Sequence, residues 1–228
     1  MEKRKTCVLL AAACALQLFV AAGVCTSALR IRRDAVRAGR MIVLECTAYD
    51  PYHPFKGRYI RLDFPAATVE AAALDSRSTD EFPEVRGTEM GSPLYCCMEC
   101  GADGLWHITG MRRNAFPQPG RGEGGAVCVK AKARLRLRLA SGGVAVTFPF
   151  AEYYLQENFA RHVDSLRADE FNALRPQLSV YVDRRGNCVQ QGLTVAYGGS
   201  RISIEDYCKT VLHPPAVARA EPRGPHAF

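Results

Sequence analysis

The longest apolar run in the chain lies near its N-terminus. Residues 7–29 carry no charged side chain, and Gln17 is their only strongly polar residue. As an α-helix, this segment would extend roughly 34 Å at about 1.5 Å per residue, enough to cross a hydrocarbon core of about 30 Å. The apolar region of a cleaved signal peptide is shorter, about 7 to 15 residues. The pattern therefore predicts an uncleaved transmembrane anchor over residues 7–29, preceded by a basic N-terminus over residues 1–6.

Two alternatives for this segment stay open. A signal peptidase could cleave the chain near residues 25–28, where small side chains gather. Cys14 could instead be lipidated after residues 10–13, although this would leave an unusually short signal. Both would give a chain that lacks the full membrane span.

Beyond residue 40 the hydrophobic pattern changes to alternation with a period of two, which is typical of strands with one buried face. Residues 57–64 alternate in this way, with Ile60, Leu62 and Phe64 on one face. The longest alternation covers residues 127–139, where apolar side chains alternate with Cys128 and five Lys or Arg. This segment predicts a long strand with one buried and one basic, solvated face.

Shorter apolar segments, separated by Gly and Pro, complete the expected domain. Further strands are expected over residues 41–48, 94–99, 105–111, 144–148, 178–182 and 188–195, and short helices over 66–74 and 158–168. The predicted fold is a mainly β, α+β domain of antiparallel hairpins with one or two short helices, spanning residues 41–212 behind the transmembrane helix. A basic juxtamembrane linker over residues 30–40 joins the two, and the proline-rich tail over residues 213–228 is predicted to be disordered.

The charge distribution weakens a nucleic-acid interpretation of the net charge of +7. Residues 1–40 contain eight basic and two acidic side chains, which leaves 22 basic and 21 acidic residues in the rest of the chain. The excess positive charge therefore flanks the membrane segment, where it marks the membrane edge and meets anionic headgroups. A specific partner site on residues 30–40 is the alternative.

Ten cysteines offer the only recognisable candidate chemistry. Cys97 and Cys100 have the spacing of a zinc or redox pair, with Cys128 and His107 as the nearest further ligands. We take buried strand cysteines as the principal interpretation, with structural disulfides in an oxidising compartment and metal or redox chemistry as alternatives. Motifs of hydrolases, nucleotide-binding proteins and zinc proteases are absent, so no catalytic residue and no cofactor is predicted.

Several short motifs, taken in order, resemble the bacterial GDYXXLXY family of membrane-anchored proteins. They are residues 16–18 (LQL), 50–51 (DP), 57–64 (GRYIRLDF), 103–106 (DGLW), 153–157 (YYLQE) and 192–193 (GL). The resemblance implies a single-pass protein of the cytoplasmic membrane with an extracytoplasmic β-rich domain and no established activity. The charge bias alone leaves the orientation open: a literal positive-inside count puts the domain in the cytoplasm, whereas exported signal anchors also begin with a short basic segment.

The chain departs from the family pattern at four positions. Arg58 replaces the Asp of the motif, and Phe64 replaces its final Tyr. Asp63 cannot substitute for the missing carboxylate, because alternation puts it on the opposite face from residue 58. Gln156 and Asn158 stand where Pro and Gly are usual. A catalytic or metal role of the family's Asp would therefore be lost here.

The expected function is an interaction module that acts with an integral membrane partner. The family-motif positions expected to contribute to binding are Asp50, Gly57, Tyr59, Leu62, Tyr153, Tyr154 and Glu157. We expect the segment around Tyr59 and the pair Tyr153–Tyr154 to form one aromatic surface. The alternative is an envelope enzyme or a metal- or redox-handling protein that uses Cys96, Cys97 and Cys100.

Overall fold

The computed structural model describes residues 2–49, 52–53, 57–70, 73, 91–114, 125–134, 144–163 and 166–212. The tail over residues 213–228 and the last part of the strand predicted over residues 127–139 lie outside these ranges.

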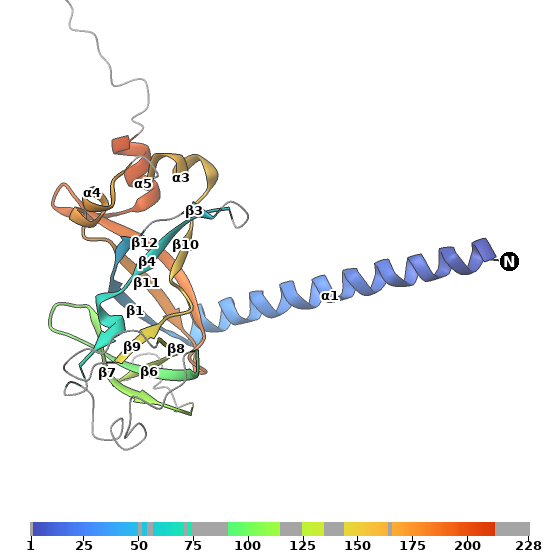
Figure 1. Cartoon of the computed structure of the whole chain (residues 1–228), viewed down its shortest axis with the longest axis horizontal. Coiled ribbons are helices and arrows are strands. Elements are labelled where there is room, and N and C mark those ends of the chain that lie inside the picture. Colours follow the sequence, from blue (N-terminus) through green and yellow to red (C-terminus); the bar gives the residue numbers. More distant parts are fainter. Residues whose placement is uncertain are drawn as a thin grey trace, which may run out of the picture.

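Helix α1 (Glu2–Ala38) carries the apolar run and does not stop where that run ends. It is long and apolar enough to cross a membrane, and Figure 1 shows it projecting from one side of the domain. The expected linker over residues 30–40 is therefore mostly helical. No Gly or Pro occurs between residues 24 and 38, and Ala and Arg are good helix formers. The helix ends at Ala38, and the amide of the next residue, Gly39, donates to the Ala35 carbonyl at 2.9 Å.

The domain is built from antiparallel strands with few short helices, as predicted. The strands are β1 (Arg40–Glu45), β2 (Thr47–Tyr49), β3 (Tyr52–His53), β4 (Gly57–Asp63), β5 (Thr68–Val69), β6 (Pro93–Cys100), β7 (Trp106–Arg112), β8 (Val127–Arg134), β9 (Val144–Thr147), β10 (Glu152–Tyr154), β11 (Gln177–Val182), β12 (Cys188–Tyr197) and β13 (Ser200–Ser203). The helical segments are η1 (Pro65–Ala67), α3 (Glu157–Val163), α4 (Ala168–Ala173), α5 (Ile204–Tyr207) and η4 (Cys208–Leu212).

The strands form three sheets that run into one another. Their orders are β1-β11-β12-β13, β10-β4-β2 with β3 also on β4, and β5-β9-β8-β6-β7. Only Cys46 separates β1 from β2, and η1 links β4 to β5. Because β4 pairs with β10 while β5 pairs with β9, these two sheets form one bent ribbon. Among the described residues, the sheets enclose one hydrophobic cluster.

Two contacts fix the bends. At the corner between β4 and β5, Phe64 packs edge-on against Phe148 and Phe150, with ring centroids 5.6 and 5.4 Å apart. On the free edge of β10, the Gln190 side-chain amide donates to the carbonyls of Phe150 and Glu152 at 2.9 Å each. This amide therefore joins β10 to β12, two strands of different sheets that do not pair with each other.

Most of the predicted strands are confirmed, and the misses have local causes. Ile60, Leu62 and Phe64 are buried, as the alternation in residues 57–64 predicts. The helix expected over residues 66–74 is confirmed only at residues 66–67, in the 3-10 helix η1, and it is wrong at Thr68–Val69, which pairs with β9 as strand β5. The helix expected over residues 158–168 is confirmed as the shorter α3 (Glu157–Val163).

Candidate functional site

Strands β4 and β10 bring two of the predicted surface residues together. Tyr59 lies directly opposite Tyr154 in the antiparallel register, and their ring centroids are 5.7 Å apart with the planes tilted by 44°. Tyr154 is 54% exposed, and its hydroxyl donates to Glu152 Oε2 at 2.8 Å. The expected proximity of the two motif segments is therefore confirmed, and Tyr59 with Tyr154 forms an outward-facing aromatic pair.

Charged side chains continue this face along the two strands. Arg61 and Asp63 share the outer face of β4 with Tyr59, and the register places Glu152 opposite Arg61. Asp63 Oδ1 lies 3.9 Å from Arg134 Nη1, and both side chains are about half exposed. We call Tyr59, Arg61, Asp63, Glu152 and Tyr154 the tyrosine face. It combines a partly exposed aromatic pair with side chains of both charges.

Tyr153 points the other way, which corrects part of the expected aromatic surface. It lies opposite Ile60, is only 9% exposed, and its hydroxyl donates to Glu205 Oε1 at 3.0 Å. Burial and the nearby Glu205 carboxylate raise the pKa of Tyr153 to about 12. Its contact with Glu205 ties helix α5 to β10, so Tyr153 supports the tyrosine face from beneath.

The remaining predicted binding positions that the structure describes are Leu62, Gly57 and Glu157. Leu62 is 1% exposed and belongs to the hydrophobic core. Gly57 begins β4, and Glu157 begins α3 with an exposed side chain. Asp50 lies outside the described residues. Alternation along the strands therefore places some motif residues in the core and others on the surface. The motif sequence alone does not show which residues are which.

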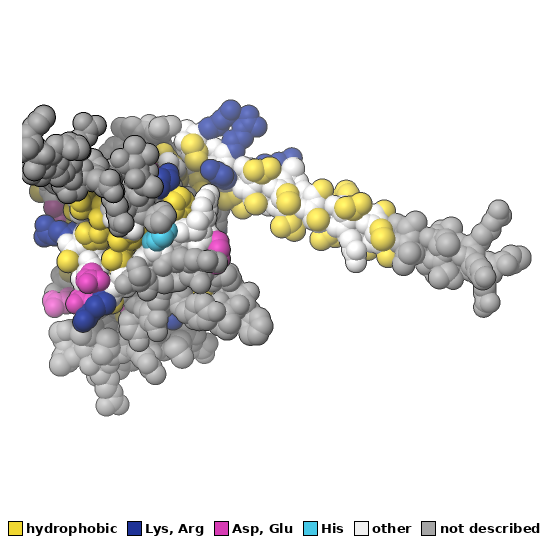
Figure 2. Space-filling view, turned by 90° about the horizontal axis from the view of Figure 1, so that it is seen from above, with side chains coloured by type: hydrophobic (Ala, Val, Ile, Leu, Met, Phe, Trp, Pro, Cys, Tyr) yellow, Lys and Arg dark blue, Asp and Glu magenta, His cyan; other side chains and the backbone are white. Residues whose placement is uncertain are grey.

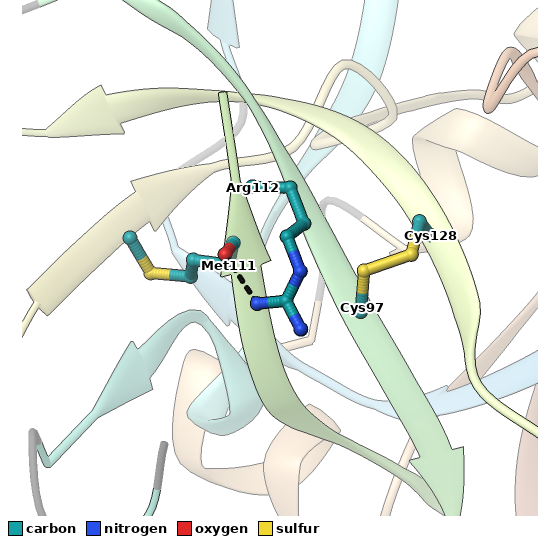
Figure 3. Close-up of a disulfide and its surroundings, with 4 residues drawn as sticks. All are labelled: Cys97, Met111, Arg112 and Cys128. Carbon is teal, nitrogen blue, oxygen red and sulfur yellow. Dashed lines mark hydrogen bonds between the residues drawn. A yellow bond between two sulfur atoms is a disulfide. The ribbon is translucent and has the colours of Figure 1, made fainter. Parts of the chain in front are cut away.

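The cysteines form one disulfide in the described part of the chain. Cys97 on β6 is bonded to Cys128 on β8, its direct cross-strand neighbour, with Cα atoms 3.9 Å apart. Figure 3 shows this bond beside the Arg112 side chain, whose Nη1 donates to the Met111 carbonyl at 2.7 Å. For Cys97 and Cys128, the alternative of a structural disulfide is therefore confirmed. The principal interpretation, free buried thiols, is wrong for these two residues.

The disulfide takes up two of the four residues in the alternative metal set. Cys100 is exposed, and His107 Nε2 lies 3.3 Å from Asp103 Oδ2. Within the described ranges, no group of three or more His, Cys, Asp or Glu side chains is arranged to hold a metal ion. The remaining pair of potential ligands offers too few donors for the usual tetrahedral zinc site.

Most other domain thiols are buried and correspondingly unreactive. Burial raises the pKa of Cys46 to about 12 and that of Cys208 to about 11. The pKa of Cys188 rises to about 12 for the same reason, and that of the fully buried Cys96 is also raised. Since the thiolate is the reactive form, these groups are poor nucleophiles at neutral pH.

A shallow groove of about 380 Å³ lies apart from the tyrosine face, between β7 and the η1–β5 segment. Its lining includes Trp106 and the carboxylates of Glu45, Glu70 and Asp103. The Arg40 guanidinium lies 5.2 Å from the centre of the Trp106 ring. The backbone amide of Leu105 donates to Asp103 Oδ1 at 3.0 Å, and this hydrogen bond lowers the pKa of Asp103. Sequence patterns missed Glu45 and Glu70, because neither belongs to a motif.

These observations define a β-rich domain behind a helix that can span a membrane. The chain matches the family model of the GDYXXLXY protein over residues 17–193, and it belongs to this family. No curated protein and no solved structure matches it.

Proposed function

We propose that this protein is a single-pass component of the cytoplasmic membrane whose domain lies outside the cytoplasm and binds an integral membrane protein through the tyrosine face. The observation that carries this proposal is the Tyr59–Tyr154 pair on adjacent strands. Tyrosine supplies a large contact area with little side-chain entropy to lose, and both Tyr and Arg are enriched in the energetically dominant parts of interfaces. The neighbouring Arg61 and Glu152 supply charges that can fix the register of a partner.

The position of β10 supports a membrane-embedded partner. Figure 1 shows β10 on the side of the domain from which α1 leaves. If α1 runs along the membrane normal, the membrane lies on that side. Strand β10, which carries the exposed Tyr154, then lies on the side of the domain that faces the extracytoplasmic loops of an integral membrane protein.

The disulfide supports the extracytoplasmic location. Disulfides persist in oxidising compartments and are rare in the cytoplasm of most organisms. Cys97 and Cys128 are directly opposite on paired strands, so their bond forms without rearrangement of the sheet. A domain held in the reducing cytoplasm would gain no stability from this pair.

Site-specific photocrosslinking in intact membranes tests the proposal. A photoreactive phenylalanine analogue replaces Tyr154 in the full chain, and in a second variant it replaces Tyr197, which is 45% exposed and also packs against another tyrosine. We expect the Tyr154 probe to form a covalent adduct with an integral membrane protein that remains in the membrane after alkaline carbonate washing. The Tyr197 probe should not form this adduct.

The matched variants Tyr59→Ala and Tyr197→Ala complete the test. Loss of the adduct in Tyr59→Ala, with retention in Tyr197→Ala, would locate the interface on the tyrosine face. Adducts of equal yield from both probe positions, or adducts only with soluble proteins, would overturn the proposal.

A further inference from the structure

The last two turns of α1 lie beyond the apolar segment but remain helical. At about 1.5 Å per residue, residues 30–38 extend the helix by roughly 13 Å past the charge-free run. This stretch contains Arg30, Arg32, Arg33 and Arg37 against a single acidic residue, Asp34. The headgroup region adds roughly 5 to 7 Å on each side of the hydrocarbon core. If residues 7–29 span the core, Arg30, Arg32 and Arg33 lie within this region, and the long side chain of Arg37 can extend back toward it.

The contact between helix and domain fixes which arginines face outward. Ala35 is completely buried, whereas its helical neighbours are exposed. Gly39 follows the last residue of α1, and a Cβ atom at this position would collide with the carbonyl oxygens of Ala35 and Val182. The helix therefore cannot rotate freely about its axis relative to β11.

Three arginines lie on the face opposite this contact. With 3.6 residues per turn, Arg30, Arg33 and Arg37 point roughly 140° to 160° away from Ala35, whereas Arg32 points only about 60° away. All four side chains are exposed. Figure 2 shows dark-blue side chains gathered on α1 where it approaches the domain, after a stretch of yellow apolar ones.

We propose that Arg30, Arg33 and Arg37 form a binding site for anionic phospholipid headgroups in the leaflet nearer the domain. A guanidinium group can donate two parallel hydrogen bonds to a phosphate, and it is less strongly hydrated than an ammonium group. Spacings of three and four residues stack the three groups along one helix face. The site goes beyond the proposed function of the tyrosine face, which lies on strands β4 and β10 rather than on helix α1.

The selectivity of the full-length protein for anionic lipid, measured by electron spin resonance, tests this site. The protein is reconstituted in phosphatidylcholine vesicles that contain spin-labelled phosphatidylglycerol or spin-labelled phosphatidylcholine. The ratio of the two association constants is then compared between wild type and the variant Arg30→Gln/Arg33→Gln/Arg37→Gln. Each basic residue near the surface contributes up to about a fivefold preference, so we expect the ratio to fall at least about threefold.

Two controls make the result specific. Arg32→Gln is compared with the single variant Arg33→Gln, because each removes one charge from the same two turns. Arg32 lies on the face near the domain, so Arg32→Gln should lower the ratio clearly less than Arg33→Gln does. The intact Cys97–Cys128 bond and the fluorescence of Trp106 report folding of every variant. An unchanged ratio in a folded triple variant, an equal loss in Arg32→Gln, or abolition of the preference by millimolar inorganic phosphate would overturn the proposal.

Discussion

Tyr153 and Tyr154 are neighbours in the chain with opposite surroundings. The ring of Tyr153 lies in the core and its hydroxyl donates to Glu205 Oε1 at 3.0 Å, whereas Tyr154 is 54% exposed. Each hydroxyl donates to a carboxylate, yet only the buried one is shielded from competing water. Tyr153 therefore stabilises the fold, whereas its neighbour Tyr154 belongs to the surface.

The variant Tyr153→Phe should destabilise the protein by about 1 to 2 kcal/mol, because the hydrogen bond to Glu205 is lost in a partly buried site. Thermal unfolding of the full-length protein in detergent, followed by the fluorescence of Trp106, measures this change. Tyr154→Phe is the matched control, since it removes an exposed hydroxyl–carboxylate hydrogen bond and should change stability by less than about 0.5 kcal/mol. Equal effects of the two substitutions would contradict this assignment.

The raised pKa of Tyr153 gives a further prediction, on the pH dependence of stability. Its pKa is about 12 in the folded protein, against the ordinary tyrosine pKa of 10.0. Between these values the folded state keeps the proton that the unfolded state releases, so the contribution is complete below pH 10 and is lost as the pH rises toward 12. Over this range the melting temperature of wild type should fall more steeply than that of Tyr153→Phe. Parallel curves would show that Tyr153 does not contribute to the decline.

At the scale of elements, alternation predicted the strands well because each strand has one face in the core. Residues 57–64 are the clearest case, with Ile60 and Leu62 buried and Arg61 exposed. Cys128 is an exception: it stands on the nominally solvated face of β8 but is 1% exposed, because it bonds to Cys97. A disulfide partner is a matter of register between distant segments, which local patterns do not contain.

The candidate site could be predicted only in part for the same reason. The two motif segments around residues 59 and 154 were expected to meet, and the antiparallel register brings them together. Which of Tyr153 and Tyr154 faces outward depends on that register, since a shift by one residue exchanges the faces. The bridging amide of Gln190 and the Glu205 partner of Tyr153 come from later segments that carry no motif.

The Cys97–Cys128 bond should contribute substantially to the stability of the β6–β8 pair. It closes a segment with a sequence separation of 31, for which the loss of unfolded-state entropy corresponds to about 3 to 4 kcal/mol. Cys97→Ser/Cys128→Ser should therefore lower the free energy of unfolding by about this amount in chemical denaturation. Cys100→Ser, which changes an exposed thiol three residues along the same strand, should have almost no effect. A double variant as stable as wild type would refute this role.

The junction between helix and domain depends on Gly39. The variant Gly39→Ala places a methyl group against the backbone carbonyls of Ala35 and Val182, and overpacking of this kind costs about 1 to 3 kcal/mol. We expect the end of α1 to separate from β11, which limited proteolysis of the reconstituted protein would detect as new cleavage near residues 30–40. Gly192→Ala is the control, because a Cβ atom at that position meets no neighbour within 4 Å. Equal protease resistance of wild type and Gly39→Ala would argue against a fixed junction.

At the scale of the whole molecule, chemical labelling of one thiol can show on which side of the membrane the domain lies. Among the free cysteines of the described domain, Cys100 is exposed, while Cys46, Cys96 and Cys208 are buried and Cys188 is partly buried with a raised pKa. A membrane-impermeant maleimide should therefore react mainly with Cys100 in the folded protein. If the domain lies outside the cytoplasm, intact spheroplasts of a bacterial host should be labelled as fully as lysed ones.

The variant Cys100→Ser should abolish this labelling, which identifies the reacting thiol. Labelling that appears only after lysis would put the domain in the cytoplasm, in agreement with the excess of basic residues that follows the span. In that case the domain would not lie in an oxidising compartment that maintains the Cys97–Cys128 bond. The proposed interaction with extracytoplasmic loops would then also be wrong. The proposed lipid site of Arg30, Arg33 and Arg37 would survive either outcome. Anionic headgroups occur on both sides of a bacterial membrane, and the three side chains stay at the same depth. One labelling experiment thus separates two roles. The role of the tyrosine face depends on the orientation of the domain, whereas that of the arginines on α1 depends only on their distance from the hydrocarbon core.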